Sequence, residues 1–196
     1  MNFLAHIYLS GKNEELILGN FIADSIKGKK YLKYPPGVQH GILLHRRIDH
    51  FTDTHPIVKK STAKLHKNYH HYSGVIVDIY YDHFLASQWA KFSQVPLEKF
   101  VADFYKLLQR NFDLLPDSIQ QFLPYMIADN WLLSYASMEG IHRILYQMNQ
   151  RTKNVVQMDR AIYDLEHQYD DFKNDFDIFF PQLQKFSANQ ILQIKE

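Results

Sequence analysis

The segment from His45 to Asp53 carries polar side chains whose spacing suits metal chemistry. On a helix, His45, Asp49 and Asp53 lie at positions i, i+4 and i+8, so an imidazole and two carboxylates share one face. Such a row can ligate a divalent cation, and it can equally be a solvated face with intrahelical ion pairs. Arg46 lies beside the row, where it could pair with Asp49 or reach a substrate phosphate. The segment alone leaves these alternatives open.

Two further carboxylates lie inside a stretch that is otherwise almost wholly apolar. Asp78 and Asp82 are four residues apart within residues 75–85, and carboxylates are rarely buried unless they are paired or bind a metal. The structural alternative is that they bond tyrosine hydroxyls or arginine side chains in the core. His6 and Asp24 interrupt apolar stretches in the same way, although a lone histidine on an apolar face is more often a core residue than a ligand.

These polar residues come from four separate stretches of helical pattern, which is how helical proteins build metal centres in a bundle interior. The chain has no cysteine, so thiolate ligands are excluded and His, Asp or Glu must hold any metal. That favours Mn²⁺ or Mg²⁺, or a histidine-rich zinc site. His66 and His70, by contrast, lie in a lysine-rich polar stretch and are interpreted as surface residues.

The elements that must position these side chains are predicted to be helices. Apolar residues recur at helical spacing almost throughout, and alternating strand patterns with Asn-Gly or Asp-Gly turns are missing, so we predict an all-α fold. A long third helix opens at Pro35-Pro36, since proline is tolerated in a first turn, and ends or bends at His55-Pro56. The other predicted helices cover residues 2–9, 13–26, 58–69, 73–92, 97–111, 116–134, 138–150, 159–169 and 171–186.

Length and composition indicate one domain of ordinary size. The 196 residues are 46% hydrophobic and 22% charged, and no linker, repeat or low-complexity tract divides them. We therefore expect a single-domain helical bundle over residues 1–196. The first ten residues lack a basic leader, and no apolar run approaches the roughly 20 residues of a membrane span. The expected location is the cytoplasm, without a membrane partner.

Charge is unevenly distributed along the chain. The formal net charge is +1, but residues 1–70 hold 11 Lys and Arg against 5 Asp and Glu. A basic first part can steer an anionic partner toward a site, or its lysines can simply solvate exposed helix faces. A net charge near zero, without a recognised motif, argues against nucleic-acid binding.

Six short stretches share both residue types and order with one known family. They are Met1–His6, Gly19–Asp24, His45–Asp53, Asp82–Leu85, Trp131-Leu132 and Tyr163–Leu165. Together they resemble the bacterial acyl-carrier-protein phosphodiesterase family, which is related to the HD phosphohydrolases, helical enzymes that set His and Asp ligands around one or two metals. The adjacent His-Asp pair of those enzymes is missing from this sequence. Its nearest features are the reversed Asp82-His83 and the spaced His45 and Asp49.

The resemblance implies an HD-phosphohydrolase-like helical bundle that uses Mn²⁺, or Mg²⁺ or another divalent ion in its place, to hydrolyse a phosphodiester. The bond joins 4'-phosphopantetheine to a serine of acyl carrier protein, so the products are apo carrier protein and free 4'-phosphopantetheine. Arg46 would clamp the phosphate, while Asp53 and Asp78 would orient the attacking water or hold the ligand imidazoles. The predicted metal ligands are His6, Asp24, His45, Asp49 and Asp82.

The resemblance also gives the basic first part of the chain a partner, since acyl carrier protein is acidic. Lys27, Lys29, Lys30 and Lys33 follow Asp24 and could line the mouth of the site. No Gly-rich phosphate loop or nucleophile elbow is present, which favours direct attack by water. Two alternatives stay open. One is an HD-like phosphohydrolase acting on a nucleotide or another small phosphoester, and the other is a non-catalytic helical module that binds carrier protein.

Overall fold

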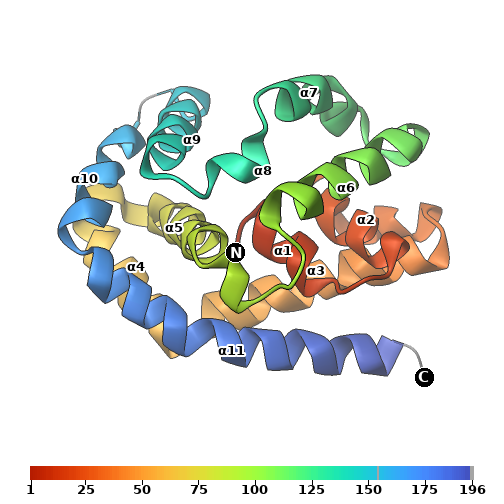
Figure 1. Ribbon diagram of the computed structural model, residues 1–196, viewed down its shortest axis with the longest axis horizontal. Helices are drawn as coiled ribbons and strands as arrows, with labels where there is room; N and C mark the ends of the chain where they lie inside the picture. Colours follow the sequence, from red (N-terminus) through yellow and green to blue (C-terminus); the bar gives the residue numbers. More distant parts are fainter. Residues whose placement is uncertain (154, 195–196) are drawn as a thin grey trace.

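The computed structural model describes residues 1–153 and 155–194, and every regular element within them is helical, as predicted (Figure 1). Among these residues no helix combines the length and apolarity that a membrane span requires. The α-helices are α1 (Phe3–Leu9), α2 (Glu14–Ile22), α3 (Pro36–Thr54), α4 (Pro56–Tyr69), α5 (Ser73–Ser87), α6 (Leu97–Arg110), α7 (Asp117–Ala128), α8 (Trp131–Ser134), α9 (Met138–Arg151), α10 (Ala161–His167) and α11 (Tyr169–Ile194). Short 3₁₀ helices are η1 (Ala23–Ser25), η2 (Gly28–Lys33), η3 (His70–Tyr72), η4 (Trp89–Lys91), η5 (Phe112–Leu114) and η6 (Met158–Arg160).

Helices α2 and α3 pack backbone to backbone, and this contact positions the candidate site. A Cβ on Gly19 would lie 2.1 Å from the Val38 carbonyl oxygen, and a Cβ on Gly41 would lie 2.4 Å from that of Leu16. Neither position therefore accepts a side chain without moving the helices apart. The close contact holds α2 against the first half of α3, one turn before the predicted ligand His45.

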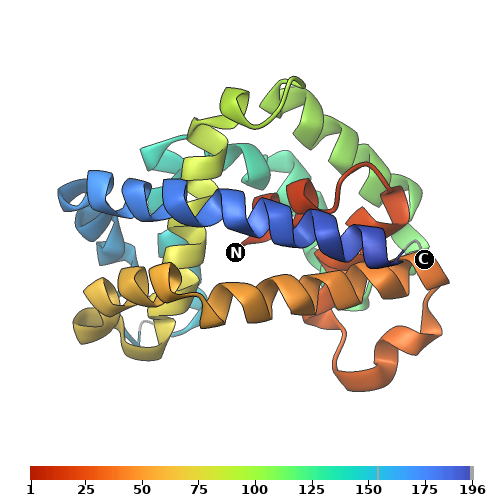
Figure 2. The same cartoon turned by 90° about the horizontal axis from the view of Figure 1, so that it is seen from below.

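An aromatic core supports this region from the side of α5 and α11. Residues 79–86 of α5 are all buried. The rings of Tyr80 and Tyr81 meet Phe172 and Phe176 of α11 edge to face, with centroids 5.1 and 5.6 Å apart. Helices α3 and α11, the two longest, run side by side along one edge of the molecule (Figures 1 and 2). The helices that carry the candidate site therefore pack against this aromatic core.

One buried charge connects α11 to α4. The carboxylate of Asp175 accepts hydrogen bonds from Lys60 Nζ at 2.8 Å, Lys64 Nζ at 2.9 Å and Ser61 Oγ at 2.9 Å. Burial raises the pKa of Asp175, but these three donors outweigh burial and lower it below its usual value. The ionised form is thus the one that the fold stabilises.

Two predicted helices are interrupted in the structure. The one expected over residues 116–134 is broken between α7 and α8 at Asn130, whose φ of 47° is left-handed, a conformation that asparagine tolerates better than most residues. The one expected over residues 13–26 ends at Ile22 because the next residues tighten into η1.

Two other boundaries differ near the end of α5 and in α11. The helix predicted over residues 73–92 ends at Ser87 and is followed by η4. The last predicted helix, residues 171–186, is part of a longer one, Tyr169–Ile194, which continues through Pro181. Buried side chains on both sides of this proline anchor α11 to the core, and this packing outweighs the lost hydrogen bond.

Candidate metal centre

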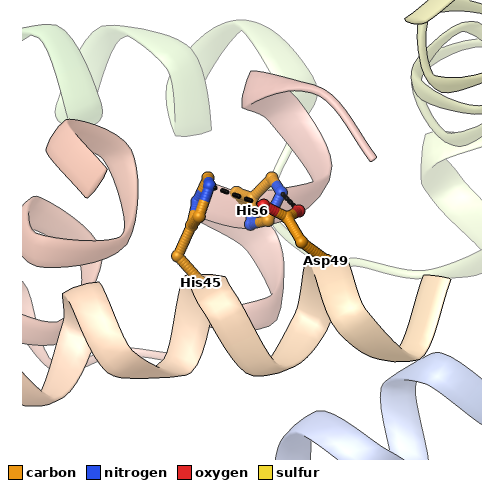
Figure 3. Close-up of side chains that lie close together, drawn as sticks. All are labelled: His6, His45 and Asp49. Atoms are coloured by element: carbon orange, nitrogen blue, oxygen red, sulfur yellow. Dashed lines mark ion pairs between the residues drawn. The ribbon is translucent and has the colours of Figure 1, made fainter. Parts of the chain in front are cut away.

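Two histidines and one aspartate converge where α1 packs against α3 (Figure 3). His6 lies within α1, and His45 and Asp49 lie one turn apart on α3. His6 Nε2 is 3.1 Å from Asp49 Oδ1, and His45 Nε2 is 2.9 Å from Asp49 Oδ2. One possible ligand atom from each residue lies within 4.8 Å of the other two. The structure thus brings three of the five predicted ligands into one cluster.

Asn20, near the end of α2, holds both imidazoles from behind. Its fully buried Oδ1 lies 2.8 Å from His6 Nδ1 and 3.1 Å from His45 Nδ1. Its Nδ2 donates to the His6 carbonyl oxygen at 3.1 Å and to Ser10 Oγ at 2.8 Å, which sets the orientation of the amide. Both Nδ1–H groups can therefore donate to one oxygen, and both Nε2 atoms face Asp49.

The Nε2 atom of His6 shows that this space suits a cation. It is buried and has no hydrogen-bond partner among the described residues, although Asp49 Oδ1 is only 3.1 Å away. An imidazole lone pair that faces a carboxylate oxygen is unfavourable unless a positive charge lies between them. Neighbouring ligands around an octahedral divalent ion are about 3 Å apart, close to the 2.9–3.1 Å separations found between these atoms. The residues therefore fit a divalent cation.

Burial and charge act differently on the three side chains. Burial, together with the charge of His45, lowers the pKa of His6 to about 4. Burial also lowers the pKa of His45, but hydrogen bonds to Asp24 and Asp49 outweigh it and raise that pKa to about 9. Burial raises the pKa of Asp49, yet the two imidazoles outweigh it and hold the pKa far below its usual value. A positive charge at this point, from a proton or an ion, is what the carboxylates require.

Asp24, in η1, lies at the rim of the cluster. Its Oδ1 is 3.1 Å from His45 Nε2, while 74% of its side chain is exposed. The hydrogen bond to His45 lowers the pKa of its carboxyl group. Asp24 is therefore the part of this arrangement that a substrate approaching from solvent meets first.

Asp82, predicted as a metal ligand, lies outside the three-residue cluster and bonds to the backbone of α1. It is buried and accepts hydrogen bonds from three backbone N–H groups, those of Asn2 at 3.2 Å, Leu4 at 2.8 Å and Ala5 at 3.4 Å. These groups lie at the N-terminus of α1, where N–H groups lack intrahelical partners. Asp82 therefore caps the helix that carries His6.

Arg46, predicted to clamp a phosphate, is engaged with the segment that leads into η2. Its Nη2 donates to the carbonyl oxygens of Ile26 and Gly28, both at 2.9 Å, and its guanidinium lies 5.3 Å from the ring centre of Tyr31. These contacts tie the segment after Asp24 to α3. The structure thus supports a positioning role for Arg46.

The two aspartates predicted to assist the ligands are also outside the cluster. Asp78 lies 2.9 Å from the amino group of Met1 and pairs with it. Asp53 is exposed one turn beyond Asp49 on α3. The shared helical face of His45 and Asp49 was predicted correctly, but Asp53 is not part of the cluster.

The four lysines predicted to dock a partner are exposed on or next to η2, which projects beside the first half of α3 (Figure 2). Leu32, 57% exposed, lies among them. The segment begins three residues after Asp24, so its basic surface adjoins the rim of the cluster. His66 of α4 and His70 of η3 are exposed, as predicted for surface residues.

Residues 1–183 match the family model described as acyl carrier protein phosphodiesterase. The chain belongs to this phosphodiesterase family. Curated relatives with that name come from Salmonella dublin, at 32% identity, and Escherichia coli O6:H1, at 31%, each over 98% of this chain and 100% of the relative. The relative from Pectobacterium atrosepticum is 29% identical over the same shares. No solved structure matches the chain, so the relation to HD phosphohydrolases stays a prediction.

In this member of the phosphodiesterase family, Asn20 contacts both imidazoles of the cluster, and it was not among the residues predicted from the sequence. A signal was present, since Asn20 interrupts the same apolar stretch as Asp24 and lies four residues before it, on the same side of a helix. A buried amide is a weaker indication of a site than a buried carboxylate, because it carries no charge. In the structure the neutral amide oxygen accepts hydrogen bonds from both imidazoles.

Proposed function

We propose that this chain hydrolyses the phosphodiester between 4'-phosphopantetheine and the serine of holo acyl carrier protein, using a divalent cation. The observation that supports this proposal is the cluster of His6, His45 and Asp49 with exposed Asp24 at its rim, in a chain of this family. A water oxygen bonds to phosphorus, and the bond from phosphorus to the serine oxygen breaks. The serine oxygen takes up a proton, which leaves apo carrier protein and free 4'-phosphopantetheine.

We propose that Mn²⁺ would be held by the Nε2 atoms of His6 and His45 and by the carboxylates of Asp49 and Asp24. A divalent ion there would neutralise charge on a phosphate oxygen and lower the pKa of a water molecule. Asn20 keeps the two Nε2 lone pairs turned toward that place. A proton on His45 Nε2 would have to leave before that atom could act as a ligand, because one lone pair cannot hold both a proton and an ion.

The exposed lysines of η2 are proposed to receive the carrier protein. An acidic partner would be attracted by Lys27, Lys29, Lys30 and Lys33, and Leu32 offers an apolar contact in their midst. Charges at an exposed rim act mainly on the rate and orientation of encounter. A carrier protein docked here would present its serine next to Asp24. Such a substrate also places the enzyme in the cytoplasm, which we propose as its location.

The reaction is tested by incubating the purified chain with holo acyl carrier protein and Mn²⁺ and measuring the carrier protein by mass spectrometry. Loss of the 4'-phosphopantetheine mass is expected, and Asp49→Ala should abolish it. Asp103→Ala removes an exposed carboxylate from α6, away from the cluster, and should leave turnover unchanged.

Two other outcomes distinguish the alternatives. Turnover of a nucleotide or small phosphoester, with none of holo carrier protein, would identify a small-molecule phosphohydrolase that uses the same cluster. Binding of carrier protein without product and without Mn²⁺ uptake would identify a non-catalytic binding module.

A further inference from the structure

A cavity of about 280 Å³ lies beside the candidate metal centre and takes no part in the steps described above. It is enclosed by the first residues of the chain and by parts of α5, α8 and α9, and Asp24 belongs to its wall. In Figure 1 the N-terminus lies between α1 and α5, below α8 and α9. Asp24 is therefore shared between the cavity and the rim of the metal centre.

We propose that this cavity binds the pantetheine arm of the substrate, so that the scissile phosphate lies over Asp24 with the arm on one side and the carrier protein on the other. The inference rests on the proposed function and adds the site that recognises the leaving 4'-phosphopantetheine. The arm is a slender, uncharged chain with two methyl groups, two amides and a terminal thiol, and the walls of the cavity suit that chemistry.

The size and polarity of the cavity fit such a chain. Its volume is near the lower end of the range for small-molecule sites, which is about 300 Å³. Ile144 and Met148 of α9, together with Val75 of α5, give it apolar walls for methylene and methyl groups. Gln147, on the same face of α9, brings one amide that can donate and accept hydrogen bonds.

The cavity wall carries charges of both signs, which favours a neutral ligand. Asp78 in the wall is neutralised by the amino group of Met1 at 2.9 Å. The guanidinium of Arg151 lies over the ring of Trp131, 5.6 Å from its centre. A second anion would meet the carboxylates of Asp78 and Asp24, and a cation would meet Arg151, whereas an amide chain disturbs neither.

A buried donor without a partner supports the proposal independently. The indole Nε1–H of Trp131, a wall residue, is buried and has no hydrogen-bond partner among the described residues. Buried donors are almost always satisfied in native proteins, so an unsatisfied one in a cavity wall indicates an acceptor that arrives with a ligand. A carbonyl oxygen of the arm is such an acceptor.

The position of Asp24 also separates the two ends of the substrate. The first exposed lysine next to η2, Lys27, is three residues after Asp24, while the cavity lies toward α8 and α9. A phosphodiester over Asp24 would therefore direct its serine side toward the lysines and its arm into the cavity. In this arrangement the lysines recognise the carrier protein and the cavity recognises the pantetheine arm, the two groups that the phosphodiester joins.

The test uses free pantetheine, which lacks both phosphate and carrier protein, and measures its binding to the full chain by isothermal titration calorimetry. Ile144→Trp should fill the cavity and weaken pantetheine binding at least tenfold. Trp131→Phe keeps a ring but removes the unpartnered donor, and it should weaken binding several-fold. Tyr146→Trp, at an exposed position of the same helix, is the matched control and should bind pantetheine as the wild type does.

Kinetics and metal binding separate this inference from the proposed function. Ile144→Trp should raise KM for holo carrier protein while Mn²⁺ affinity stays unchanged, and Tyr146→Trp should change neither. If Ile144→Trp does not fold, Gln147→Ala provides the same comparison with a smaller side chain. Wild-type chain that hydrolyses holo carrier protein but binds no pantetheine at millimolar concentration, with KM unchanged in the variants, overturns the cavity assignment alone. Pantetheine binding without any hydrolysis supports the cavity and overturns the proposed reaction.

Discussion

Among single residues, Asn20 determines the geometry of the candidate centre more than any ligand does. Each ligand supplies one or two atoms, whereas Asn20 Oδ1 sets the tautomer and orientation of both imidazoles. Its own amide is held by the His6 carbonyl oxygen and Ser10 Oγ. We therefore expect Asn20 to control whether the two Nε2 lone pairs point toward a bound ion, although its own side chain would not touch that ion.

Replacing Asn20 with Leu should lower Mn²⁺ affinity by about 10–100-fold, the usual effect of losing an outer partner of metal-bound histidines. The leucine has a similar volume but accepts no hydrogen bond, so both Nδ1–H groups lose their partner. Calorimetric titration with Mn²⁺ measures the change. Ser10→Ala is the comparison, since it removes a partner of the Asn20 amide and leaves Oδ1 in place, and its effect should be much smaller. Equal Mn²⁺ affinity in Asn20→Leu and wild type would contradict this role.

At the scale of elements, two carboxylates hold helices in the positions that the site needs. Asp82 of α5 caps α1, and Asp175 of α11 holds α4 through two lysines and a serine. Both are buried, and both bond only to protein donors. Buried carboxylates in this fold thus serve packing as well as chemistry.

Asp82→Ala should reduce the free energy of unfolding by about 2–4 kcal/mol, because it leaves buried N–H groups of α1 without an acceptor. Urea denaturation measures the loss. Asp82→Asn keeps one acceptor oxygen and should cost less than half as much. A metal ligand would behave in the opposite way, since Asp82→Ala would then abolish Mn²⁺ binding while stability changed little.

Asp175 predicts a pH dependence of stability. Its pKa in the folded chain is below the unfolded value, so its contribution is present above the unfolded pKa and is lost as pH falls through the folded pKa. Asp175→Asn should therefore be less stable than wild type at pH 7, by about 2–3 kcal/mol for a broken buried pair whose lysines keep some solvent. The difference should shrink below about pH 4, where the carboxylate begins to gain its proton in the unfolded chain while it stays ionised in the folded chain. Urea titrations of both proteins at pH 7 and pH 3 give the comparison, and a gap that stays constant would show that the ion pairs are not its cause.

Across the whole molecule, the basic η2 segment, the exposed Asp24 and the cavity follow one another along the surface. Arg46 fixes η2 to α3 by bonds to two carbonyl oxygens, so the lysines keep their place next to Asp24. A carrier protein docked on η2 would bring only its phosphate to the candidate metal centre. Substitutions of the η2 lysines should therefore affect docking without changing the residues of the centre.

Lys29 and Lys30 replaced together by Glu should raise KM for holo carrier protein several-fold, with a smaller effect on kcat, because rim charges act on encounter. Added salt should mimic the change, since exposed charges are screened over about 10 Å at 0.1 M. Lys59 and Lys67, exposed on α4, form the matched pair with the same change in charge and should leave KM unaffected. Steady-state kinetics at two salt concentrations measure both. A similar rise of KM in the two double variants would show a general charge effect and place the docking surface elsewhere.

Residue spacing along a single helix was sufficient to predict the fold class and the helical faces. The all-α fold follows from apolar residues at helical intervals, and the shared face of His45 and Asp49 follows from their separation by four residues. These are local properties, since neighbours along a helix have the same relation in any surroundings. The family resemblance seen in six short stretches was confirmed by the family match over residues 1–183.

Contacts between buried polar residues of different helices could not be predicted from spacing, because they depend on how the helices pack. His6 and Asp82 looked alike in sequence, each a polar residue on an apolar face, yet α1 turns His6 toward Asp49 and its own N-terminus toward Asp82. The partner of each residue is distant in the chain, 78 residues away for the contact of Leu4 with Asp82. Periodicity specifies the face of a helix that is buried, but the packing of distant helices specifies whether a carboxylate on that face caps a backbone or can hold an ion.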